Sequence, residues 1–68
     1  MRYAIVIEKV EGNYSAYVPD LPGCTATGAT VDAVAEEILE AIRFHLDGLK
    51  EDRLPIPPPT SIAAFAEI

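Results

Sequence analysis

Cysteine, histidine and basic side chains are scarce in this chain of 68 residues, which contains one cysteine, one histidine and five lysines and arginines together. A single cysteine cannot close an internal disulfide bond, which is typical of a protein in a reducing cytoplasm. One cysteine and one histidine are also too few ligands for a tetrahedral metal site. The sequence therefore predicts a cytoplasmic protein that holds no metal and no cofactor.

The basic residues are outnumbered by eleven aspartates and glutamates, so the formal net charge is −6. A protein of this charge does not neutralise phosphates, and we expect no direct contact with nucleic acid. It can attract a basic partner, including a protein that itself binds nucleic acid. Solubility alone is the alternative reason for the charge.

Long hydrophobic runs are absent, because the N-terminal stretch MRYAIVIEKVEG meets an acidic residue at Glu8. That is too early for a signal peptide or a membrane span. The chain is also short, and folding at this size buries only about 60% of the surface of the unfolded chain. Disulfides and metals, the usual supports of small proteins, are missing, so we expect the remaining common one, self-association into a dimer or a tetramer.

Four segments alternate apolar and other residues with the period of two that is typical of β-strands. Gly12, after the first segment, fits a tight hairpin to the second, because glycine tolerates a positive φ. Four prolines between residues 51 and 60 force an extended connection that returns the chain to the sheet. The predicted strands are residues 2–10, 14–18, 24–29 and 61–68.

A helix is predicted from Val31 to about Leu49, where apolar residues recur at the helical spacing. Thr30 is a good N-cap, and Asp32 lies in the first turn, where a negative charge complements the helix dipole. The apolar stripe consists of Val31, Val34, Ala35, Ile38, Ile42, His45, Leu46 and Leu49.

The order of these elements predicts an α+β fold, β-β-β-α-β, in a single domain over residues 1–68. Sequential strands usually neighbour one another and crossovers are right-handed, so the simplest sheet is mixed and four-stranded, in the order 3-2-1-4. The last strand is then parallel to the first, and the helix covers one face. We expect the other face to expose apolar residues, which again indicates a second subunit.

The stretch VPDLPGCTATGAT, residues 18–30, connects the second strand to the helix. Pro19 and Pro22 end the strand and shape a turn, and Gly23 is expected at positive φ. Gly28 is expected to let the backbone bend or pass close to a neighbour. We interpret the stretch as a shaping element rather than an active-site loop.

No group of residues predicts catalysis. Cys24 has no basic residue within ten positions, so it is better interpreted as a small buried side chain than as a nucleophile. His45 falls on the helix stripe and is interpreted as packed there. Glu8 could meet an acidic residue of the helix around Mg²⁺, but the helix acids are predicted to face solvent. The glycines form neither GxGxxG nor a P-loop.

Five segments carry a resemblance to a known family: RYAIVIEK, YSAYVPDLPGC, GAT, EEILEAIRFHLDGLKED and LPIPPP, in this order. Together they resemble the HicB antitoxins, in the branch that consists of the N-terminal domain alone. The resemblance covers nearly the whole chain and implies a reduced RNase H-like fold. It also implies that nuclease activity is absent, and the last segment, AAFAEI, lacks the aspartate that such a nuclease needs.

The resemblance implies a partner, HicA, a small basic toxin that has a double-stranded-RNA-binding-like fold and cleaves mRNA with a histidine. Acidic side chains could meet lysines of such a toxin, and two turn residues are expected to be exposed beside them. Many HicB proteins carry a second, DNA-binding domain, which we do not expect here because the chain stops at Ile68. The candidate contact residues are Asp20, Leu21, Glu36, Glu37 and Glu40.

Two alternatives stay open at this point. One is a free-standing homo-oligomer that binds a small ligand between its subunits. The other is a remnant metal-dependent nuclease that uses Glu8.

Overall fold

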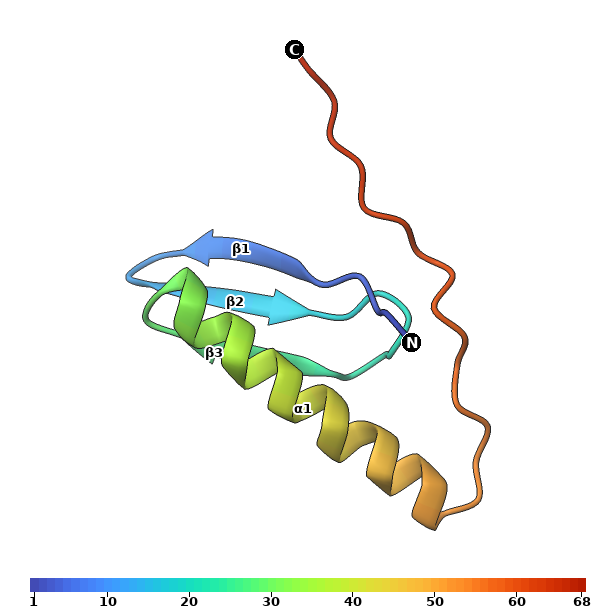
Figure 1. The fold of residues 1–68 in the computed structure, drawn as a ribbon. Helices are drawn as coiled ribbons and strands as arrows, with labels where there is room; N and C mark the ends of the chain where they lie inside the picture. Colours follow the sequence, from blue (N-terminus) through green and yellow to red (C-terminus); the bar gives the residue numbers. More distant parts are fainter.

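The computed structural model describes residues 1–68 and shows three β-strands followed by one long α-helix. In Figure 1 the strands form one layer, the helix lies along one face of it, and the C-terminal segment extends past the sheet. The fold is therefore α+β with the order β-β-β-α. The elements are β1 (Val6–Val10), β2 (Asn13–Tyr17), β3 (Thr25–Gly28) and α1 (Val31–Glu51).

The sheet is an antiparallel meander in the order β1-β2-β3, which confirms the predicted neighbours of the first three strands. Val6 lies opposite Tyr17 in the β1–β2 pair, and Tyr17 lies opposite Thr25 in the β2–β3 pair. Gly12 turns the chain between β1 and β2 at a φ of 74°, a conformation that costs glycine little. β1 and β3 are the two edges of this sheet, and β1 pairs on one side only.

The outer face of the sheet, which points away from α1, is less apolar than expected. Alternate residues of a strand point to opposite faces, and Tyr3, Ile5 and Ile7 pack against the core on the inner face. Val6, Val10 and Tyr17 are the large apolar side chains of the outer face. Their neighbours there are Glu8, Ser15, Thr25 and Thr27. The expectation that this face exposes apolar residues holds for Val10 and Tyr17, whereas polar side chains fill the positions between them.

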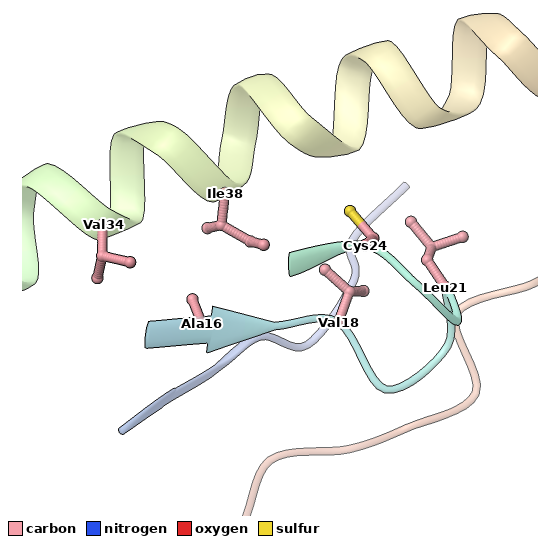
Figure 2. Close-up of a cluster of buried hydrophobic side chains, with 6 residues drawn as sticks. All are labelled: Ala16, Val18, Leu21, Cys24, Val34 and Ile38. Atoms are coloured by element: carbon pink, nitrogen blue, oxygen red, sulfur yellow. The ribbon is translucent and has the colours of Figure 1, made fainter. Parts of the chain in front are cut away.

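Six side chains form the buried core between α1 and the sheet, and none of them is more than 3% exposed. Val34 and Ile38 project from α1 toward β2 in Figure 2. The other four come from β2 and from the turn that follows it: Ala16, Val18, Leu21 and Cys24. The turn after β2 therefore supplies more of the buried side chains than the helix does.

α1 begins at the expected N-cap, where Thr30 Oγ1 accepts a hydrogen bond from the Ala33 N–H at 3.0 Å. It ends two residues beyond the predicted Leu49. The Leu54 N–H donates back to the Leu49 carbonyl at 2.9 Å, and Arg53 adopts a left-handed conformation with a φ of 56°. These features form a Schellman motif, in which a residue other than glycine occupies the left-handed position.

The fourth strand predicted at residues 61–68 is not formed. Residues 54–68 are neither helix nor strand, and no backbone–backbone hydrogen bond involves residues 55–68. The proline segment does return to the sheet, since the Tyr3 hydroxyl donates to the Pro57 carbonyl at 2.6 Å. The predicted order 3-2-1-4 is therefore wrong in its last strand. Alternation shows that a segment is able to form a strand, but pairing also needs an edge at hydrogen-bonding distance.

Gly28, at the end of β3, marks the closest approach of the sheet to the helix. A Cβ atom built on Gly28 would lie 2.7 Å from the Val34 nitrogen and 2.9 Å from its Cα. Backbone atoms cannot move aside as a flexible side chain can, so only glycine fits. This agrees with the close backbone approach expected from the sequence.

Replacing Gly28 with alanine should therefore destabilise the fold, whereas Gly48→Ala should stabilise it. The added methyl group at residue 28 forces β3 and α1 apart, for which we expect a loss of about 1–3 kcal/mol in the free energy of unfolding. Gly48 lies within α1 with no atom within 4 Å of the added Cβ. There we expect a gain of about 0.5–1 kcal/mol, because alanine favours the helix.

Urea denaturation of the two variants and the parent chain measures both effects. The variants add the same methyl group, so the difference in sign depends on the environment alone. Equal stability of the two variants would contradict the close contact at Gly28.

Candidate protein-binding surface

The connection between β2 and β3 is a compact turn that is closed by its own backbone. The Val18 N–H donates to the Cys24 carbonyl at 3.2 Å. Inside this loop, the Leu21 N–H donates to the Val18 carbonyl and the Cys24 N–H donates to the Leu21 carbonyl, each at 3.1 Å. Gly23 has a φ of 84°, as the sequence indicated. The turn has a defined shape, which fits the interpretation of this stretch as a shaping element.

Leu21 does not lie exposed at this turn, as the sequence analysis expected, but is fully buried in the core. Figure 2 shows its side chain directed to the same interior as Cys24 and Val18. The bonds on either side of Leu21 turn the loop inward, and burying a leucine side chain favours folding by about 1.5–3 kcal/mol. In this conformation Leu21 therefore exposes no surface through which it could contact a partner.

Asp20, the neighbour of Leu21, points the other way and holds the C-terminal segment. Its Oδ2 accepts hydrogen bonds from the backbone N–H groups of Thr60, at 3.0 Å, and Ser61, at 2.9 Å. Its Oδ1 accepts from the hydroxyl groups of the same residues, at 3.1 Å from Thr60 and 2.9 Å from Ser61. We call these four bonds the Asp20 clamp. The clamp joins residues 40 and 41 positions apart, which no local pattern in the sequence predicts.

The hydrogen bond from the Ser61 N–H, with the other bonds of the clamp, holds the pKa of Asp20 below its ordinary value of 3.8. The carboxylate is therefore charged in the folded protein, and its charge strengthens the bonds that it accepts. Of the acidic residues proposed as partner contacts, Asp20 is the one whose two carboxylate oxygens both accept hydrogen bonds within the chain.

The other three candidate contact residues lie on the solvent side of α1. Glu36, Glu37 and Glu40 are all exposed, as the helical spacing predicts. Glu40 is paired with Arg43 at 3.2 Å, and this is the one ion pair of the chain. Glu36 and Glu37 therefore have no basic partner and keep their full charge available. We call the surface formed by these three glutamates the acidic helix face.

Phe44 borders the acidic helix face and was not identified from the sequence. It lies four residues after Glu40, one turn along the same side of α1, and its side chain is 79% exposed. The available signal was that Phe44 falls outside the apolar stripe, among charged residues. Exposed aromatic side chains often provide the strongest contacts of protein interfaces.

Cys24 and His45 line one cleft of about 430 Å³ between the turn and the second half of α1. Cys24 is buried, which confirms its interpretation as a small core side chain. No hydrogen bond joins the two residues, and burial raises the pKa of the Cys24 thiol above its ordinary value of 9.0. The thiol is therefore neutral and carries no nucleophilic thiolate.

The acidic residues are not assembled around a point that could hold a metal ion. Glu8 lies on the outer face of the sheet, opposite the face that α1 covers, so the sheet separates it from the helix glutamates. No three histidine, cysteine, aspartate or glutamate side chains converge anywhere in the chain. The structure thus does not bring together the residues that the nuclease alternative requires.

The fold and this surface define a small acidic α+β domain, and α1 is not long and apolar enough to cross a membrane. Comparison with known families then gives the particular family. The profile of the HicB-like antitoxins of bacterial toxin–antitoxin systems matches residues 3–67. The chain belongs to this family, which confirms the resemblance found in its sequence motifs.

The chain is also similar to curated proteins of a phage and of archaea. An uncharacterised 14.9 kDa protein of Haemophilus phage HP1 is 40% identical over 96% of this chain and 49% of its own length. A UPF0150 protein of Thermoplasma acidophilum is 41% identical over 84% of both chains. A UPF0150 protein of Archaeoglobus fulgidus is 46% identical over 69% of this chain and 70% of its own. The chain spans about half the length of the phage relative, and no solved structure gives a significant match.

Replacing Asp20 with alanine should release the C-terminal segment from the sheet, because four hydrogen bonds are lost. We expect faster amide exchange at Thr60 and Ser61 by nuclear magnetic resonance, and earlier proteolysis after residue 61. Asp20→Asn is the matched control. Its amide oxygen can accept from both N–H groups, and its amide nitrogen can donate to both hydroxyl groups. The segment should therefore stay bound in this variant, although more weakly than in the parent chain.

The Asp20 clamp should also weaken in acid. A folded-state pKa below the ordinary value means that the charged carboxylate stabilises the fold above pH 3.8, and that this contribution is lost as the pH falls through the folded pKa. The Thr60 and Ser61 amide shifts should follow this titration in the parent chain and not in Asp20→Asn. Identical titration of both proteins would contradict the clamp.

Proposed function

We propose that this chain is an antitoxin that binds a small basic mRNA-cleaving toxin of the HicA type and neutralises it by protein–protein contact. The observation that carries the proposal is the family match over residues 3–67. A toxin that binds RNA must present basic side chains to phosphates. An acidic protein that covers those side chains removes the RNA-binding surface, without any chemical step of its own.

The acidic helix face is the surface that we propose for this contact. Glu36 and Glu37 are exposed without an ion-pair partner in the chain, so they are free to pair with lysines or arginines of the toxin. Glu40 would exchange its exposed pair with Arg43, which costs little because such surface pairs contribute at most about 1 kcal/mol. Charges of this kind steer association and select the partner.

Phe44 supplies the apolar contact that charges alone do not provide. It projects from the same side of α1 as Glu40, and 79% of its side chain is exposed. A toxin pocket that buries this ring would gain affinity, whereas the surrounding glutamates would fix the orientation. The proposed contact does not involve Leu21, which is buried, or Asp20, whose oxygens bind Thr60 and Ser61.

Charge reversal on the acidic helix face tests this proposal. Glu36→Lys with Glu37→Lys should weaken binding of a basic HicA-type toxin from the same organism by more than about tenfold, since two favourable ion contacts become repulsive. The matched control is Glu8→Lys with Glu11→Lys, which makes the same change in net charge on exposed residues of β1 and its hairpin. We expect the control to retain binding within a few-fold. Isothermal titration calorimetry measures both constants.

The complex should also weaken as salt concentration rises, because exposed charges beyond a Debye length of about 8 Å are screened at physiological ionic strength. Equal losses in the two double variants would show that only net charge matters and that the acidic helix face is not the site. Absence of any complex with a basic HicA-type protein of the same organism at low salt would overturn the proposed function itself.

A further inference from the structure

The C-terminal tail, Ile62–Ile68, has the composition of a buried strand but none of its contacts. Ile62 is 90% exposed and Phe65 is 99% exposed, and Ile68 is fully exposed. No backbone group of the tail forms a hydrogen bond within the chain. Ordering an extended segment costs about 1–2 kcal/mol per residue in backbone entropy, which nothing in the isolated chain offsets here.

The free edge of β1 is the complementary feature on the same molecule. β1 pairs with β2 on one side only, so the N–H and C=O groups of its other side are unpaired. A cleft of about 540 Å³ separates this edge from the tail, and it is lined only by apolar residues. These are Ile5, Val6, Ile7, Ile62, Ala63, Ala64 and Phe65.

A second apolar cleft, of about 300 Å³, lies beneath the same edge between the start of the chain and α1. Its lining residues are Met1, Tyr3, Ile5, Ala35, Ile38, Leu39 and Ile42. A strand added along β1 and continued beside Tyr3 and Ile5 would point alternate side chains into this cleft. The tail alternates in this way, with Ile62, Ala64, Ala66 and Ile68 on one side.

The size of the molecule shows how much surface is uncovered. Its accessible surface is 5345 Å², against about 4,200 Å² expected for a compact monomer of 7.3 kDa. Its radius of gyration is 13.0 Å, against about 11 Å expected for a compact domain of this length. The excess surface is about 1,200 Å² per chain. Covering it on two copies would bury about 2,400 Å², in the range of obligate homodimers, about 2,000–5,000 Å².

We propose that two copies of this chain exchange their tails, so that each tail adds as a fourth strand along β1 of the other copy. A second copy is the occupant that supplies the strand and the free edge together, and a two-fold axis satisfies both at once. The segment before the tail, residues 57–61, favours pairing of the tail with another copy over pairing with β1 of its own chain. The Tyr3–Pro57 bond and the Asp20 clamp fix the base of the tail, and the prolines before it are stiff. The tail then runs outward past the sheet, as Figure 1 shows.

Analytical ultracentrifugation of the full chain over a range of concentrations tests the dimer. We expect a dimer whose dissociation constant rises by more than about tenfold in Ile62→Asp with Phe65→Asp, since two anchoring side chains per tail are lost. Val31→Asp with Phe44→Asp is the matched control, since it places the same two charges at other exposed apolar positions, both on α1, and should leave the dimer intact. Circular dichroism should show α1 retained in all variants, because the tail lies outside the core.

Isotope-filtered nuclear magnetic resonance on a mixture of differently labelled chains then identifies the owner of each tail. We expect contacts between the Ile62 and Ile5 methyl groups, and between the Phe65 ring and the Val6 methyl groups, across differently labelled chains. A monomer at all concentrations, or contacts within one label only, would overturn the exchange. A dimer that survives the tail variant would overturn it as well. These measurements use no toxin, so their failure leaves the proposed antitoxin function untouched, and failure of toxin binding leaves the exchange untouched.

Discussion

Close packing of α1 on β2 and β3 is the constraint on which the rest of this structure depends. The core contains only six buried side chains, and Val34 and Ile38 contribute the helix half of it. Gly28 allows the backbones of β3 and α1 to come within contact distance. In a chain of this size little other apolar surface is buried, so the register of the helix on the sheet determines which helix residues remain exposed. The acidic helix face is the direct consequence of that register.

The turn after β2 divides its residues between two tasks. Leu21 and Cys24 point into the core, whereas Asp20 points outward and holds Thr60 and Ser61. Adjacent residues thus connect the interior of the domain to the base of its tail. This arrangement explains why a stretch with two prolines and two glycines lies here without any catalytic group, because its function is to direct side chains.

Two surfaces of the chain remain available for protein contact, and they lie on different elements. The acidic helix face is on the solvent side of α1, whereas the tail and the free edge of β1 are at the side of the sheet. A toxin on the first surface and a second copy on the second would therefore not compete for the same residues. Charge dominates the first surface and backbone pairing dominates the second, so the two contacts should differ in their response to salt.

The sequence by itself determined the features that arise from neighbouring residues. The first three strands, the helix with its Thr30 cap, the left-handed Gly12 and Gly23, and the exposed glutamates all follow from periodicity and local backbone preference. The motif order was also enough to indicate the family. Only the tertiary structure decided that Leu21 is buried, that Asp20 binds residues 40 and 41 positions away, and that the tail stays unpaired. Those outcomes depend on which distant groups come within bonding distance, and a local pattern does not contain that information.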